Sequence, residues 1–182
     1  MTHFPWYCEK TSTDRIGQGD MFFECPVIRV MSPSNIAGTP NEMLANATKI
    51  LNADIVILTQ DCDLANNKTE NIILCSHVSI DYWFQATNCT TPKSQQSSFD
   101  KLRKGELPSL HLLDYHERII SKHRIVNFHE IFITPRKILE EHMKSIPIRL
   151  QLQSPYREHL SQAFARFFMR VGLPGEVSPL PK

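Results

Sequence analysis

The chain has 182 residues, which is enough for a single domain with its own hydrophobic core. Twenty lysine and arginine residues face 19 aspartate and glutamate residues, and the net charge of +1 excludes a whole-molecule field that would attract nucleic acid or an anionic membrane. No apolar run approaches the ~20 residues that cross a bilayer, and the N-terminus lacks the basic and apolar segments of a signal peptide. Five cysteines without a C-x-x-C pair favour reduced thiols, so we expect a cytoplasmic protein that is not bound to a membrane.

The N-terminal region begins with an unpatterned segment. Residues 1–15 mix aromatic and polar side chains without a usable period, so we expect an irregular arm. Gly19 and Asp20 have the composition of a tight turn, and a first strand is predicted over residues 21–30. Pro26 interrupts that strand and predicts either a sheet edge or a bulge, because proline cannot donate to a strand ladder.

The next segment supplies the centre of the predicted sheet. Thr39 and Pro40 are typical of a helix start, and this helix is predicted to reach about Leu51. Residues 54–59 are rich in β-branched side chains, which indicates a central strand buried on both faces. The strand ends in four polar side chains that we call the Gln60–Asp63 edge: Gln60, Asp61, Cys62 and Asp63. We expect this edge to carry the chemistry of the protein.

The second half of the chain alternates strands and helices around one polar insertion. Strands are predicted over residues 71–78, 110–113, 124–128, 130–134 and 148–152. Helices are predicted over residues 79–86, 99–105 and 135–144. Residues 87–98 are rich in threonine, serine and glutamine, and we expect them to form a mobile insertion.

The strongest helical pattern lies at residues 154–172. Ser154 is the predicted N-cap, Pro155 takes the first helical position, and Gly172 ends the helix. Its apolar stripe consists of Tyr156, Leu160, Phe164, Phe167 or Phe168, and Val171. The stripe predicts that the helix packs on a sheet. Another face groups His159, Arg166 and Arg170, which we interpret either as a solvated surface or as a contact for phosphate or an acidic partner.

Cys62 has two interpretations. Its thiol could act as a nucleophile if His111 or His129 removed the proton and Asp61 or Asp63 oriented that histidine. Two adjacent carboxylates disfavour a thiolate, however, and free cysteine is among the residues most often buried. We therefore favour a buried, unreactive Cys62 and keep catalysis by this thiol as an alternative.

A metal site is the other chemical alternative. The candidate ligands in or beside predicted strands are Cys25, Cys62, Cys75, His77, His111 and His129. Only Cys75 and His77 are closely spaced, and Asp61 with Asp63 is more typical of a turn than of a magnesium site. Common nucleotide-binding, serine-hydrolase and zinc-protease motifs do not occur in the sequence. We therefore predict neither a metal nor a cofactor.

Two resemblances add expectations about fold and context. Residues 58–64, Leu-Thr-Gln-Asp-Cys-Asp-Leu, resemble the signature of a bacterial family to which no reaction is assigned and whose members are sometimes encoded near phage-defence genes. The Gly19–Asp20 turn before the first strand, with short strands and a terminal helix, is similar to the PemK/MazF small β-barrel of toxin endoribonucleases. That resemblance implies a barrel opened by the turn and a basic residue that assists cleavage, for which this sequence has no assignable counterpart.

Together these patterns predict one α+β domain spanning residues 1–182, built as a strongly bent antiparallel sheet or small PemK-like barrel with the C-terminal helix packed on it. The leading functional expectation is a bacterial defence- or toxin-type protein that contacts nucleic acid or a partner protein through the Gln60–Asp63 edge, with Gly19, Asp20, His159, Arg166 and Arg170 as further binding candidates. One alternative is a cysteine-dependent hydrolase or transferase. The other is a non-catalytic protein-interaction module, which the near-neutral charge favours.

Overall fold

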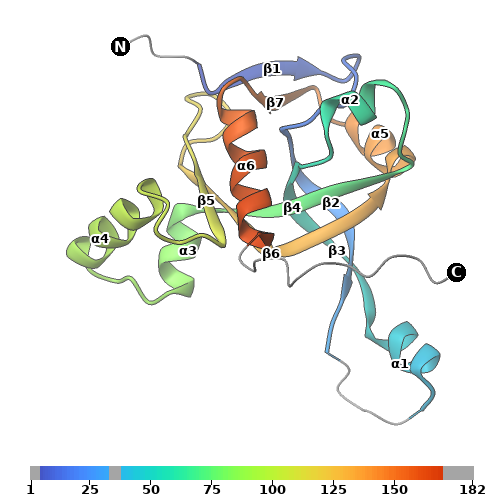
Figure 1. Cartoon of the computed structure of the whole chain (residues 1–182), viewed down its shortest axis with the longest axis horizontal. Coiled ribbons are helices and arrows are strands. Elements are labelled where there is room, and N and C mark those ends of the chain that lie inside the picture. Colours follow the sequence, from blue (N-terminus) through green and yellow to red (C-terminus); the bar gives the residue numbers. More distant parts are fainter. Residues whose placement is uncertain (1–4, 33–37, 170–182) are drawn as a thin grey trace, which may run out of the picture.

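The computed structural model describes residues 5–32 and 38–169. Its strands form one seven-stranded antiparallel sheet in the order β1-β7-β2-β3-β4-β6-β5, so the predicted central strand does lie in the middle (Figure 1). The sheet is not closed into a barrel, because β1 and β5 end the strand order on opposite sides without pairing to each other. The mixed α+β class is thus confirmed, and the expectation of a barrel is wrong.

The described residues contain the following elements. The strands are β1 (Tyr7–Thr11), β2 (Asp20–Val30), β3 (Thr48–Ile57), β4 (Asn71–Ser79), β5 (Leu110–Leu113), β6 (Arg124–Pro135) and β7 (Ile148–Leu152). The helices are α1 (Pro40–Ala47), α2 (Asp61–Ala65), α3 (Ile80–Ala86), α4 (Pro92–Arg103), α5 (Arg136–Lys144) and α6 (Tyr156–Phe168). None of the helices in this described part is long and apolar enough to span a membrane.

Each face of the sheet carries its own hydrophobic core. Val56 points into the core beneath α6, whereas Ile55 and Ile57 point into the core beneath α5, and all three side chains are fully buried. This confirms the predicted strand that is covered on both faces. Helix α6 crosses one face of the sheet and packs Leu160 against it, as its apolar stripe predicted (Figure 1). Phe168, by contrast, is mostly exposed.

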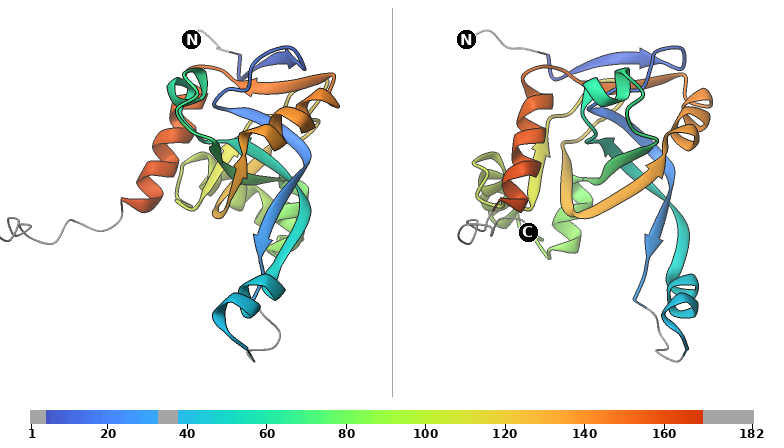
Figure 2. Two further views of the ribbon diagram at one scale, coloured as in Figure 1. Left: turned by 90° about the vertical axis from the view of Figure 1, so that its right-hand side faces the viewer. Right: turned by 45° about the vertical axis from the view of Figure 1, so that its right-hand side comes forward.

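Strands β2 and β3 extend beyond the rest of the sheet as a two-stranded arm with α1 at its tip (Figure 2). Helix α1 is held by the predicted N-terminal signals, since the Thr39 side chain accepts from Glu42 N–H, Glu42 reaches back to Thr39, and Pro40 follows the cap. Strand β2 pairs with β7 only at Asp20 and Met21, so at Pro26 its ladder partner is β3 alone, through Asn52. The predicted edge position of Pro26 is therefore confirmed.

Several local predictions are wrong. The helix predicted to reach about Leu51 ends at Ala47, because residues 48–51 pair with β2 as the start of β3. Residues 7–11 form the edge strand β1 rather than an irregular arm, because they pair with β7 over a sequence separation that no local pattern reveals. Residues 92–98 begin helix α4 where a mobile insertion was predicted, because Thr91 and Ser94 form a reciprocal capping box around Pro92 at the first helical position. Pro155, not Ser154, is the N-cap of α6, and the Arg157 N–H donates to the Gln153 carbonyl instead of a side-chain cap. The predicted end of that helix lies outside the described residues.

A buried ion pair joins β2 and β7, two neighbouring strands that lie far apart in the sequence. Arg149 in β7 donates from Nε to Oδ2 of Asp20 over 2.9 Å, and both side chains are almost fully buried. The Arg149 guanidinium also donates to the carbonyls of Thr11, Asp14 and Arg15, which fixes the loop after β1. Burial raises the pKa of Asp20 to about 6, although Arg149 acts in the opposite direction. The Gly19–Asp20 turn is therefore part of the core of the fold.

Candidate functional site

The Gln60–Asp63 edge forms the start of the short helix α2 at the protein surface. Asp61 accepts from Arg15 Nη2 over 3.1 Å and from the Gln18 N–H over 3.3 Å. Asp63 lies 3.9 Å from Lys68 Nζ. The Cys62 side chain is exposed, so the expectation of a buried thiol is wrong: the strand ends at Ile57 and the helix turns Cys62 outward.

The candidate histidines lie elsewhere. His111 in β5 stacks on Phe128, and His129 in β6 meets Phe167 of α6 edge-on. Burial and, to a smaller extent, the nearby His159 lower the pKa of His111 to about 4. Within the described residues the Cys62 thiol hydrogen-bonds to Asp63 and to no histidine. The structure therefore does not bring the proposed nucleophile and base together.

The remaining sequence candidates are dispersed. Asp20 is sealed in the core, and Gly19 adopts a φ of +82° in the turn that precedes it. His159 and Arg166 are exposed on α6, while Arg170 lies outside the described residues. Among the residues that the structure describes, no three His, Cys, Asp or Glu side chains gather as metal ligands would.

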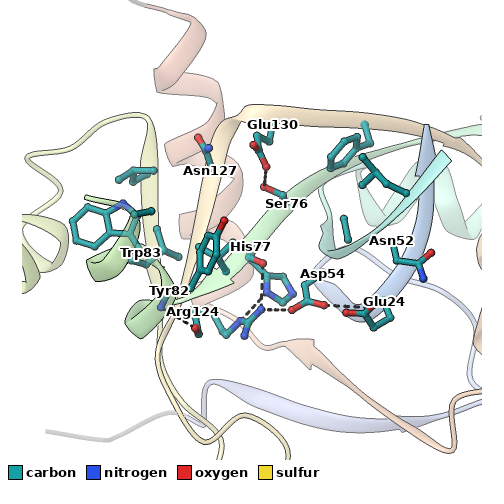
Figure 3. Close-up of a pocket in the computed structure, with 18 of the residues that line it drawn as sticks. Glu24, Asn52, Asp54, Ser76, His77, Tyr82, Trp83, Arg124, Asn127 and Glu130 are labelled. Atoms are coloured by element: carbon teal, nitrogen blue, oxygen red, sulfur yellow. Dashed lines mark hydrogen bonds and ion pairs between the residues drawn. The ribbon is translucent and has the colours of Figure 1, made fainter. Parts of the chain in front are cut away.

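A concave site lies where the arm leaves the body of the protein. It is a cleft of about 700 Å³, here called the root cleft, lined by residues of β2, β3, β4, α3, β5 and β6. In Figure 3 Tyr82 and Trp83 of α3 stand at one end of the cleft, Glu24 and Asn52 of the arm stand at the other, and His77 and Asp54 lie between them. Tyr82 is 60% exposed.

Irregularities in two strands shape the root cleft. The register of β2 against β3 shifts between Phe22 and Cys25, and Glu24 within this bulge has a φ of +51°. The register of β4 against β6 shifts between Cys75 and Ser76, so that residues 128–130 loop out of the ladder. Bulges re-aim side chains, and a non-glycine residue in the left-handed region costs about 1 kcal/mol or more. Both features are more common near functional sites than in plain sheet.

One polar network occupies the floor of the cleft. Arg124 donates from Nε to Nδ1 of His77 over 2.9 Å and from Nη2 to the carboxylate of Asp54 (Figure 3). Asp54 also accepts from the Glu24 N–H over 3.1 Å, which holds the bulge in place. Burial lowers the pKa of His77 well below its ordinary value, and the adjacent Arg124 lowers it further. His77 is therefore neutral at physiological pH, with its Nδ1 already used as an acceptor.

A second network lies on the wall formed by β4 and β6. Ser76 Oγ donates to Glu130 Oε2 over 2.8 Å, and Arg29 of the arm donates to Glu130 Oε1 over 2.9 Å. Each arginine of the cleft is thus matched by one carboxylate. Within the described residues the Glu24 carboxylate has no hydrogen-bond or ion-pair partner. Two guanidinium groups face three carboxylates, so the cleft carries one uncompensated negative charge, that of Glu24.

Comparison of the chain with protein-family models and with curated proteins finds no match.

The sequence does not predict the root cleft, because its residues come from separate elements without motif spacing. The available signal was the presence of charged residues inside predicted strands: Glu24 interrupts the apolar run of β2, and Asp54 precedes the central β-branched run. For His77 the sequence indicates only a candidate metal ligand, closely spaced with Cys75.

Proposed function

We propose that the protein is a non-catalytic binding module that receives a segment of a partner protein in the root cleft. The observation that carries this proposal is the open cleft of about 700 Å³ with an exposed aromatic wall beside polar groups. Aromatic side chains that line a concave surface are frequent anchors for ligands and peptides. The amides of Asn52 and Asn127 add groups that can both donate to and accept from a peptide backbone.

The ionisable groups of the root cleft favour binding over catalysis. His77 is kept neutral and bonded to Arg124, so it is poorly suited to carry a proton to or from a substrate. The Cys62 thiol lacks a histidine partner, which removes support from the cysteine-dependent alternative. A phosphodiester ligand, which the likeness to PemK/MazF barrels implies, is opposed by the excess of carboxylates.

The arm supplies further support for a partner protein. Ile28 and Ile50 lie opposite each other on the arm and are 50% and 77% exposed, and Val30 beside them is 59% exposed. A group of large apolar side chains on a projecting ribbon is typical of a contact surface. Successive side chains of a strand point to opposite faces, so this apolar surface lies on the face of the arm opposite to Arg29, which lines the root cleft.

The test is a selection of short random displayed peptides against the wild-type protein and a blocked variant. Ala86→Trp places a bulky ring in the cleft from an exposed position of α3, and Ala65→Trp makes the same change at an exposed position of α2. We expect peptides that bind the wild type and Ala65→Trp but not Ala86→Trp. Peptides that bind all three proteins equally, or no enriched peptide, would contradict a binding site in the root cleft.

A further inference from the structure

The root cleft has a charge pattern that selects a particular kind of group. Arg124 is held by His77 and Asp54, and its side chain is only 11% exposed. Arg29 is held by Glu130. The Arg124 guanidinium cannot be offered to an anionic ligand without breaking its ion pair with Asp54, whereas Arg29, whose side chain is 42% exposed, keeps N–H donors beyond the one that Glu130 accepts. An incoming anion would also meet the free Glu24 carboxylate.

Glu24 is placed to receive a positive charge. Its backbone is fixed in the β2 bulge by the hydrogen bond from its N–H to Asp54, so the residue is held at the arm end of the cleft. Its own side chain is exposed and unpaired within the described residues. Because both arginines of the cleft are already paired with other carboxylates, the Glu24 carboxylate takes no part in their ion pairs.

The opposite end of the cleft suits the same ligand. Tyr82 and Trp83 present aromatic rings to the cavity (Figure 3). Aromatic faces attract guanidinium and ammonium groups and also pack against the long aliphatic stems that carry them. One residue of the cleft makes such a contact: the Arg124 guanidinium carbon lies 5.4 Å from the centre of the ring of Phe23, a residue that does not itself line the cleft.

We propose that the root cleft recognises an organic cation, a guanidinium or primary ammonium group on an extended stem, with Glu24 as the residue that determines this specificity. The proposal rests on the binding function proposed above and names its ligand class. The stem lies along the aromatic wall and the charged group reaches Glu24. An arginine or lysine side chain of a partner and a free polyamine share this chemistry.

Fluorine NMR of protein labelled with fluorotryptophan tests the ligand class directly. The chain has two tryptophans, and Trp83 lies in the cleft while Trp6 stacks on Tyr156, so Trp6 is an internal control. The probes are acetyl-arginine amide, its neutral isostere acetyl-citrulline amide, acetyl-glutamate amide and spermidine. We expect the arginine compound to shift the Trp83 resonance but not that of Trp6, and to bind roughly five- to tenfold more tightly than the citrulline compound.

Two variants test whether Glu24 is the residue that distinguishes the charged arginine compound from the neutral citrulline compound. Glu24→Gln should reduce affinity for the arginine compound to that of the citrulline compound, whereas Glu24→Asp should keep most of it. Glu117→Gln removes the same charge from an exposed loop position and should change nothing. Tighter binding of spermidine than of the arginine compound would support recognition of an organic cation and would indicate a polyamine, not a partner's side chain, as the ligand.

The outcomes separate the two proposals. Equal binding of the citrulline or glutamate compound, or unchanged discrimination in Glu24→Gln, would overturn the cation assignment while leaving a binding cleft. No shift of Trp83 with any probe would overturn the cation assignment, and the peptide selection would then decide whether the cleft binds a partner of another kind.

Discussion

Glu24 sits in a backbone conformation that glycine adopts at lower cost. Its φ of +51° lies in the left-handed region, where a Cβ atom is crowded. Glu24→Gly should therefore raise the free energy of unfolding by about 0.5–1 kcal/mol while it removes the free carboxylate from the root cleft. Urea denaturation measures the change. Asn52→Gly, at an exposed β3 position with an ordinary strand conformation, should instead destabilise the protein by a similar amount.

His111 predicts a pH dependence of stability. Its pKa is lowered to about 4 in the folded protein, so folding favours the neutral ring. The stabilisation is complete above the unfolded pKa of about 6.5 and is lost as the pH falls through about 4. Between neutral pH and pH ~4 the wild type should lose about 2–3 kcal/mol more than His111→Phe, which keeps a ring but does not titrate. Thermal unfolding across this range measures the difference, and parallel curves would contradict the assignment.

The residues of the candidate site were the hardest part to predict. Cys62 and its polar neighbours cluster in the sequence and so predict a site, yet the thiol is exposed and its hydrogen bond goes to Asp63. Arg124 and Asp54 are 70 positions apart and meet only because β3, β4 and β6 lie side by side. Local patterns report on period and capping, whereas such a site depends on strand order and register.

Among the elements, α6 offers the clearest test of packing. Leu160 is almost fully buried in the core that α6 shares with β7 and β6. Leu160→Ala should lower the free energy of unfolding by roughly 2–5 kcal/mol, because it removes buried methyl groups and leaves a cavity. Gln162→Ala, at an exposed position of the same helix, should have an effect within about 0.5 kcal/mol. Equal effects in chemical denaturation would mean that α6 does not pack as described.

Most elements could be predicted because their signals are local. Strands β5 and β7 have the predicted bounds, and α3 (Ile80–Ala86) matches the helix predicted over residues 79–86 to within one residue. The elements that were not predicted depend either on pairing with a strand distant in the sequence or on a helix sequence that is unusually polar. Strand β1 is defined by its pairing with β7, and α4 contains serine and glutamine where an amphipathic stripe would be expected. The arm was also missed, because nothing local shows that a ribbon projects from the body.

At the scale of the whole molecule, the buried Asp20–Arg149 ion pair connects β2 with β7 over a separation of 129 residues. Arg149→Met should lower the free energy of unfolding by about 3–5 kcal/mol, since it leaves the Asp20 carboxylate buried and removes donors from the Thr11, Asp14 and Arg15 carbonyls. Adding Asp20→Asn should restore part of the loss, because it removes the uncompensated charge. Denaturation of the two single variants and the double variant measures the coupling, and strictly additive losses would contradict it.

The same pair sets the order in which the protein can mature during synthesis. Asp20 leaves the ribosome 129 residues before Arg149. At about 5–20 residues per second this interval lasts roughly 6–26 s. Throughout it, β1 has no strand to pair with and Asp20 has no counter-charge, because β7 supplies both. The β1 strand and the Asp20 carboxylate can therefore reach their final environment only after β7 has been synthesised.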